Sequence, residues 1–284
     1  MPERITLHQI SSRAWEHPAD RAALNTLRAL PGFDEVVKKI IGYFGERGIR
    51  QLFLANAVRV GGAQRPKLDA LYTEVLETLD APMRYDLYVS QTPVVNAFAI
   101  GFERPFIVIN SGTLGLLNRE QQRNVLAHEV GHILSGHATY TTLAILILTI
   151  GIGNLPFLAG LALLPFELAL LEWYRKAEFS ADRAGLLGSQ DARASMEVYL
   201  KFAGGGTRGG IDFEDENSDP IDLDAFLVQA AEYEGQDGLV DKLFQLLNTA
   251  FRTHPMGTVR AGELQRWIAS GEYDVHDADT SAAG

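Results

Sequence analysis

The segment His128-Glu129-Val130-Gly131-His132 constrains the fold of this chain more than any other feature of the sequence. Residues four apart lie one turn above each other on the same face of a helix, so a helical segment lets both imidazoles reach one point. Glu129 then projects about 100° round the helix axis from His128, beside that point rather than onto it. The segment therefore predicts a helix that carries two imidazoles and a neighbouring carboxylate.

The residues around this segment also favour a helix. Asn118 is a candidate N-cap, and the helix is expected to run to about Ser135, with Gly136 as its stop. Apolar residues recur at helical spacing along it and predict a buried face, formed by Val125, Leu126, Val130, Ile133 and Leu134.

Two histidines at this spacing indicate a zinc site. The chain has no cysteine, so a metal ion must be held by histidines and carboxylates. Zinc lowers the pKa of a bound water to roughly 7, and Glu129 is placed to take a proton from that water. A third ligand must come from elsewhere, with one position left for water.

Two candidates for the third ligand lie downstream. His137 follows His128 by nine residues, or two and a half turns, which puts it on the opposite face of a continuous helix. We therefore reject His137 as a ligand and interpret it as a polar residue at the helix end. Glu178 is the better candidate, and Asp182, one turn further, would orient a ligating imidazole. Taken alone, these two acids are more simply an exposed pair on a helix.

The remaining sequence predicts an α+β fold that is mainly helical, with a small sheet beside the zinc helix. Helical spacing marks residues 33–44, 67–79, 168–187 and 225–270, and alternation marks strands at 85–89, 96–101 and 106–109. A turn at Glu103-Arg104-Pro105 would join the last two strands as a hairpin.

We divide the chain into an N-terminal helical segment at 1–64, a metalloprotease domain at 65–270 and a disordered tail at 271–284. A flexible, acidic loop is expected at 204–224. Residues 143–171 are strongly apolar and long enough to span a bilayer, but glycines and prolines interrupt them. A single crossing would separate His132 from Glu178, so this stretch is either a hairpin that contacts the membrane or a buried helical pair.

The net charge argues against one class of protein, and the N-terminal residues bear on the location of the chain. The formal net charge is −11, and no basic stripe with aromatic residues is present, which argues against nucleic-acid binding. The N-terminus has no apolar signal segment, so we expect a cytoplasmic location, with the inner face of the cell membrane as an alternative.

The sequence resembles the HtpX-like metalloendopeptidases, relatives of the CAAX prenyl protease. The resemblance covers roughly residues 65–265 and rests on three ordered motifs: the zinc helix, Arg175-x-x-Glu178-x-x-Ala181-Asp182, and Thr253-His254-Pro255 followed by Arg260. A fourth, weaker match is Asn96-Ala97-Phe98-Ala99.

The resemblance implies a zincin-type fold and a role for each motif. Glu178 would be the third ligand of one zinc ion per chain, and Asp182 would support the site. His254 and Arg260 would lie at the active centre, where His254 stabilises the oxyanion. Asn96, Ala97, Phe98 and Ala99 would form an edge strand that pairs with the substrate backbone.

The expected function is thus a zinc-dependent metalloendopeptidase that acts on polypeptides in protein quality control, with Glu129 as general base. The alternative is a non-catalytic protein that keeps the fold and binds membranes or unfolded chains. A zinc hydrolase with a non-peptide substrate is a third possibility.

Overall fold

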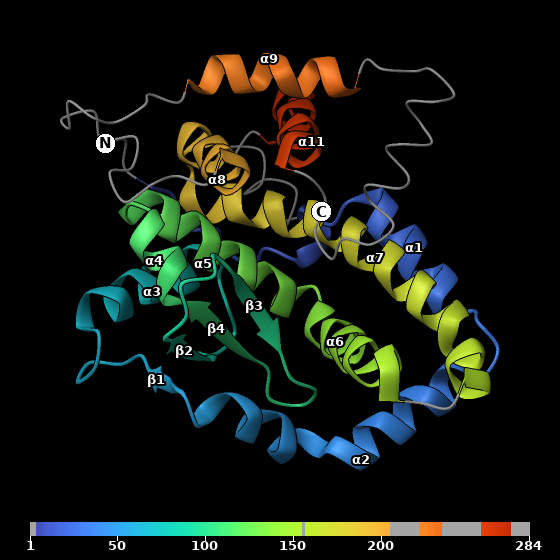
Figure 1. Ribbon diagram of the computed structural model, residues 1–284. Coiled ribbons are helices and arrows are strands. Elements are labelled where there is room, and N and C mark those ends of the chain that lie inside the picture. Colours follow the sequence, from blue (N-terminus) through green and yellow to red (C-terminus); the bar gives the residue numbers. More distant parts are fainter. Residues whose placement is uncertain (1–3, 155–156, 205–221, 235–256, 274–284) are drawn as a thin grey trace.

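A computed structural model describes residues 4–154, 157–204, 222–234 and 257–273. Helices dominate, and a small sheet lies at one side of them, so the expected α+β class is confirmed (Figure 1). The described helices are α1 (Pro18–Arg28), α2 (Phe33–Leu54), α3 (Pro66–Thr78), α4 (Ser111–Leu116), α5 (Arg119–Leu134), α6 (His137–Asn154), α7 (Phe157–Ser189), α8 (Ala192–Gly204), α9 (Leu223–Glu234) and α11 (Gly257–Ala269).

The sheet contains four strands in the order β1-β2-β4-β3. β3 (Ala97–Ile100) pairs antiparallel with β4 (Phe106–Asn110), as the hairpin prediction required. β2 (Asp86–Ser90) runs parallel to β4, and β1 (Ala57–Arg59), which the sequence pattern did not indicate, pairs antiparallel with β2. This order leaves β3 at one edge of the sheet, next to α5.

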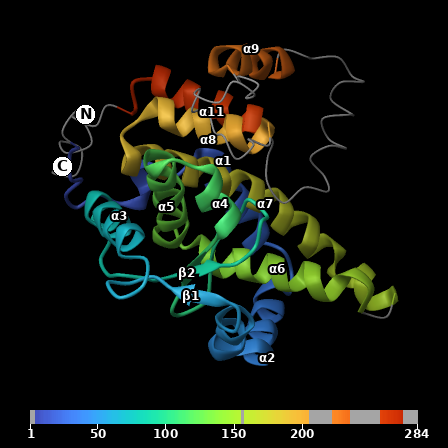
Figure 2. The ribbon, with the colours of Figure 1, turned by 60° about the vertical axis from the view of Figure 1, so that its left-hand side comes forward.

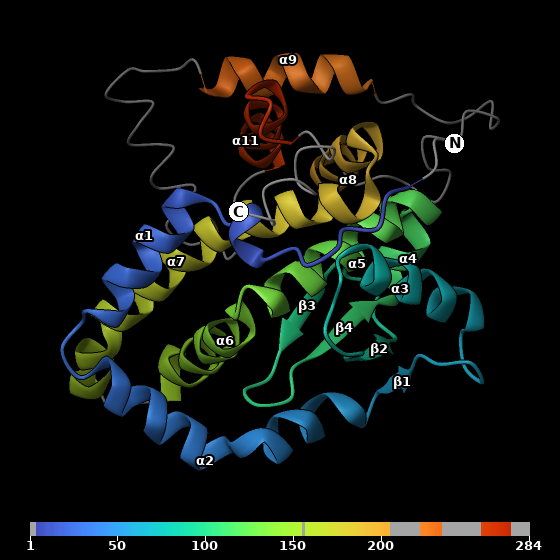
Figure 3. The same ribbon diagram turned by 180° about the vertical axis from the view of Figure 1, so that it is seen from behind.

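Helix α5 forms the centre of the molecule. It contacts β3 and α3 on one side and α7 on the other, and Figures 1 and 3 show it between the sheet and α7. Its apolar residues join the main core, where Leu126 and Val130 are fully buried together with Ile107 of β4 and Leu71 of α3. The polar face is also buried, since residues Gln121 to Ile133 are all buried apart from the half-buried Gln122. Burial on both faces makes α5 a rigid platform for the side chains it carries.

The other elements cover this centre from two ends. α8, α9 and α11 stack beyond α7, while α2 lies at the far end beside β1 (Figures 1 and 2). α2 bends at Gly45, whose backbone is left-handed with φ of 60°, directly after the helix predicted at 33–44. α1 runs along α7, as Figure 3 shows from behind.

The apolar stretch 143–171 forms parts of two helices that pack together, α6 and α7, and α7 continues through Pro165. Within the described part of the chain, no helix combines the length and the apolar character that a membrane crossing requires. His254, most of the acidic loop at 204–224 and the tail from 274 onward lie outside the described residues.

Candidate metal centre

Local sequence signals fix helix α5, which carries two of the site's side chains. Asn118 caps it by accepting a hydrogen bond from the Gln121 N–H at 3.0 Å, and the Gln121 side chain accepts one from the Asn118 N–H at 3.0 Å. This reciprocal capping box satisfies two backbone donors of the first turn. The helix ends at Leu134, and Gly136 follows in a left-handed conformation with φ of 71°.

Small residues let α7 approach α5 closely enough to complete the site. A Cβ atom added to Gly131 would clash with the Cβ of Ala184, and one added to Gly188 would clash with the Cβ of Ala127. The two helices therefore touch almost backbone to backbone at both points. This close approach brings Glu178 and Asp182 of α7 against the histidines of α5.

His128, His132 and Glu178 converge in the interior of the protein. One nitrogen of each imidazole and one carboxylate oxygen all lie within 4.8 Å of one another. Glu178 Oε1 is 3.3 Å from His132 Nε2, and Glu178 Oε2 is 3.6 Å from His128 Nε2. The Glu178 side chain is only 1% exposed. Glu178 lies 50 residues after His128 and 46 after His132, yet the three present two nitrogens and an oxygen to one point. This is the donor set that zinc and similar ions accept.

Asp182 of α7 and Arg260 of α11 lie next to this cluster. Asp182 Oδ1 accepts a hydrogen bond from His128 Nδ1 at 3.0 Å, which leaves His128 Nε2 directed toward Glu178. Arg260 donates from Nε to Asp182 at 2.9 Å and lies 3.0 Å from Glu178 Oε2 through Nη1. Its guanidinium also lies over the ring of Tyr199, 5.1 Å from the centroid. Arg260 therefore links the two acids of α7.

Burial and neighbouring charges shift the pKa values of these groups in different directions. Burial lowers the pKa of His132 to about 4, against the opposing effect of Glu178, so this imidazole is neutral at pH 7 as a metal ligand must be. Burial also acts to lower the pKa of His128, but Asp182 and Glu178 outweigh it and the net shift is upward. Burial opposes ionisation of Asp182, yet Arg260 and His128 hold its pKa below the ordinary value.

The charge balance of the site fits a divalent cation. Glu129, Glu178 and Asp182 are all buried, and the Arg260 guanidinium pairs with Glu178 and Asp182. When the three acids are ionised, their charge exceeds that of Arg260 by about the charge of one divalent ion. Burial raises the pKa of Tyr174 on α7 well above its ordinary value, and the Glu178 and Glu129 carboxylates add to this shift. Donor set and charge together indicate a metal ion.

His137 is placed differently from what the sequence pattern suggested. The argument from a continuous helix fails because the chain turns at Gly136 and a new helix begins at His137. His137 is not part of the three-residue cluster, but its Nδ1 lies 3.0 Å from His132 Nδ1. It is 2% exposed and contacts Asp20 of α1, a residue that the sequence analysis did not single out. Gly136, which follows His132 by four residues and was expected to end the helix, is the signal that was available.

The proposed substrate strand lies at the sheet edge. The Asn96 backbone is fixed within the protein, since its N–H donates to Thr113 Oγ1 at 2.7 Å and its carbonyl accepts from the Thr113 hydroxyl at 2.8 Å. Ala97, Phe98 and Ala99 belong to β3 itself, and Ala97 and Phe98 are half-buried.

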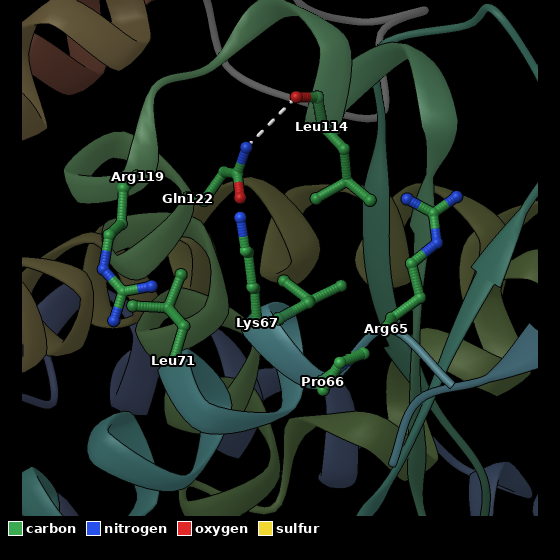
Figure 4. A pocket seen from close by; sticks show the side chains of 8 residues that line it. Arg65, Pro66, Lys67, Leu71, Leu114, Arg119 and Gln122 are labelled. Carbon is green, nitrogen blue, oxygen red and sulfur yellow. Dashed lines mark hydrogen bonds between the residues drawn. The ribbon is translucent and has the colours of Figure 1, made fainter. Parts of the chain in front are cut away.

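A separate cavity of about 580 Å³ lies between α3, α4 and the first turn of α5. Figure 4 shows Arg65, Lys67 and Arg119 around it, with the Gln122 amide donating to the Leu114 carbonyl at 3.1 Å. None of its lining residues belongs to the histidine–glutamate cluster.

Two histidines and a glutamate held by two buried helices, with a second glutamate adjacent, define the site of a metal-dependent hydrolase. The model of peptidase family M48 matches residues 62–268. The chain therefore belongs to peptidase family M48 and is a metalloprotease.

Individual relatives agree with this assignment. The chain is 34% identical over 264 residues to the "Plastoglobule-localized metallopeptidase 48, chloroplastic" of Arabidopsis thaliana, covering 91% of this chain and 73% of that protein. It is 27% identical over 234 residues to a "Protease HtpX homolog" of Pseudarthrobacter chlorophenolicus, covering 74% of this chain and 75% of that protein. No solved structure matches the chain.

Proposed function

We propose that the chain is a zinc-dependent metalloendopeptidase in which His128, His132 and Glu178 hold one zinc ion. The convergence of their donor atoms within 4.8 Å carries this proposal. Zinc accepts two imidazole nitrogens and one carboxylate oxygen while keeping a position for water or substrate. Zinc bound there would polarise the peptide carbonyl and make a water molecule acidic enough to react at neutral pH.

Glu129 is the proposed general base. It follows His128 in α5, is 4% exposed, and lies beside the cluster rather than in it. In this position its carboxylate takes a proton from the attacking water and then passes that proton to the leaving amine. Burial excludes bulk water from this exchange and strengthens the electrostatic interactions around the reacting atoms.

Asp182 and Arg260 are proposed to orient the ligands. Asp182 accepts from His128 Nδ1 and so keeps His128 Nε2 available for the metal. Arg260 holds Asp182 and Glu178 together from α11. His254 is proposed as the oxyanion-stabilising residue on the resemblance of its motif alone.

We propose that the substrate binds as an added strand along β3. An edge strand next to the catalytic helix supports this, because backbone pairing would lay an extended peptide beside α5. Since both backbone groups of Asn96 are bonded to Thr113, the pairing would involve Ala97, Phe98 and Ala99. Backbone pairing favours unfolded polypeptides, which suits a role in protein quality control.

Replacing Glu129 by Gln tests the function directly. The variant keeps the ligands but lacks the base, so casein cleavage should fall about 100- to 10,000-fold while one zinc ion stays bound per chain. A chelator should abolish cleavage by the native protein. Chelator-insensitive cleavage, or a fully active Glu129→Gln variant, would overturn the proposal. Native protein that binds zinc and unfolded casein without cutting it would favour the non-catalytic alternative.

A further proposal concerns the membrane. Helix α7 exposes apolar side chains in its first half, with Leu164 43% and Leu168 54% exposed, and the neighbouring α6 exposes Ile145 by 38%. We propose that these side chains contact a lipid surface without the helices crossing it. Carbonate extraction of cell membranes is the test, and recovery of all the protein in the soluble fraction before extraction would contradict the contact.

A further inference from the structure

A chain of buried hydrogen bonds leads from His132 away from the metal cluster. His132 Nδ1 lies 3.0 Å from His137 Nδ1, and His137 Nε2 lies 3.0 Å from Asp20 Oδ2. The exposed fractions are 5% for His132, 2% for His137 and 2% for Asp20. These residues come from α5, α6 and α1, so three helices meet behind one of the proposed zinc ligands.

Asp20 is held firmly at the end of this chain. Its Oδ1 accepts a hydrogen bond from Trp173 Nε1 at 3.0 Å, and its Oδ2 accepts one from Ser180 Oγ at 2.6 Å. The start of α1 is fixed at the same place, because the His17 N–H donates to Ser180 Oγ at 2.8 Å. Burial opposes ionisation of Asp20, but the hydrogen bonds from His137, Ser180 and Trp173 hold its pKa below the ordinary value. Asp20 therefore stays a carboxylate, an acceptor with no proton to donate.

This acceptor decides where the protons of the two imidazoles lie. A neutral imidazole carries one proton, so a neutral His137 must hold its proton at Nε2 to donate to Asp20. His137 Nδ1 is then an acceptor, so the 3.0 Å contact requires His132 to donate from Nδ1. His132 Nε2 then carries a lone pair and no proton, and it lies 3.3 Å from Glu178 Oε1. Two electron-rich atoms at this separation are stabilised by a cation between them.

We propose that Asp20 and His137 are positioning residues for His132, which fix the tautomer and the ring orientation that metal binding needs. The inference rests on the proposed zinc site. It assigns the N-terminal helix α1, which precedes the family match at 62–268, a part in building the metal centre. His132 thus has an outer carboxylate, as a metal-bound histidine commonly does, but reaches it through a second imidazole.

Nitrogen-15 NMR of the histidine rings tests the proton placement in the native protein without any substitution. The expected result, with and without zinc, is His137 protonated at Nε2 and unprotonated at Nδ1. In the metal-free protein, His132 should carry its proton at Nδ1. A doubly protonated His137, or a His137 proton at Nδ1, would overturn the proposal, because His132 would then have to present a protonated Nε2 to the metal.

Zinc affinity, measured by competition with a chromogenic chelator, tests the consequence. Asp20→Asn and His137→Gln should each weaken zinc binding roughly 10- to 100-fold. Tyr140→Phe is the matched control, since it removes a different hydrogen bond between the same two helices, that from Arg28 Nε to Tyr140 Oη at 2.9 Å. This control should bind zinc like the native protein. Native affinity in both folded test variants would overturn the proposal.

A double variant separates positioning from general loosening of the fold. If His137 transmits the effect of Asp20, then Asp20→Asn should change zinc affinity little in a His137→Gln background. Fully additive losses would contradict the relay. The proposed function fails separately, since it is lost if the native protein binds no zinc through His128, His132 and Glu178. If the native protein does bind zinc there, the variants test the relay alone.

Discussion

The two histidines of the metal centre are supported in different ways. His128 donates directly to Asp182, which lies on α7 one turn beyond Glu178. His132 contacts His137, which in turn contacts Asp20 of the N-terminal helix. The first arrangement is local to two helices that the metal motifs define, whereas the second depends on a segment more than 100 residues upstream. The sequence motifs therefore include the residue that supports His128, whereas the residues that support His132 are brought together only by the fold.

The largest effect is expected where the two arrangements meet, at Glu178. Glu178→Gln removes the shared carboxylate charge, so zinc affinity should fall by more than the roughly 100-fold expected for an outer partner, and proteolysis should be lost. Glu172→Gln on the same helix is the control, because that side chain is 52% exposed. Isothermal titration with zinc measures both variants. Similar affinities for the two would show that Glu178 is not a ligand.

Comparing Asp182→Asn with Asp20→Asn sharpens the contrast between the direct support of His128 and the relayed support of His132. Asp182 is 3% exposed and pairs with the buried Arg260, so its loss leaves part of a guanidinium charge uncompensated, at a cost of about 3–5 kcal/mol. The described contacts of Asp20 are with His137, Trp173 and Ser180, none of which carries a guanidinium charge, so the loss of Asp20 should cost less. Urea unfolding of the metal-free variants gives both values. An equal or smaller loss for Asp182→Asn would contradict this ranking.

Gly131→Ala should weaken the support of both histidines together. The new methyl group would meet Ala184, which belongs to the facing helix and has no flexible end that can move aside. Overpacking of this kind costs about 1–3 kcal/mol. Thermal unfolding measures the loss, with Gly115→Ala as the control because a Cβ atom there meets nothing within 4 Å. Unchanged stability of Gly131→Ala would show that the α5–α7 contact is looser than described.

The smallest effect concerns the stability of the protein in acid, through the contact between His17, just before α1, and Glu263 of α11. Glu263 of α11 lies 3.6 Å from His17, and this contact, with Arg266, lowers its pKa to about 2. Because the folded-state pKa lies below the ordinary value of 4.5, the stabilisation is complete above 4.5 and is lost as the pH falls toward 2. Glu263→Gln should flatten the stability profile in that window. An identical pH dependence in both proteins would contradict the assignment.

Local signals in the sequence were sufficient for much of the site. The His128/His132 spacing, the Asn118 cap and the hairpin strands each depend on neighbours within a few residues, and the structure has them as expected. The convergence of Glu178 with the histidines was implied by resemblance, since nothing in the spacing of distant helices specifies which of their side chains meet.

The residues that support His132, His137 and Asp20, could not be predicted from such local signals. The exclusion of His137 as a ligand assumed a continuous helix, and the left-handed turn at Gly136 redirects the chain so that His137 faces His132. Asp20 occurs in a polar segment, and only the packing of α1 on α7 buries it. The short strand β1 was missed because its three residues are too few for a periodic pattern.

X-ray absorption spectroscopy of the zinc-loaded protein tests the central claim most directly. The account predicts one zinc ion per chain with two imidazole nitrogens at about 2.0–2.1 Å and oxygen donors at about 2.0–2.2 Å. The imidazole signal should decrease by half in either His128→Ala or His132→Ala and remain unchanged in His137→Gln. A third imidazole on the metal, or a signal unaffected by changes at His128 and His132, would contradict the account.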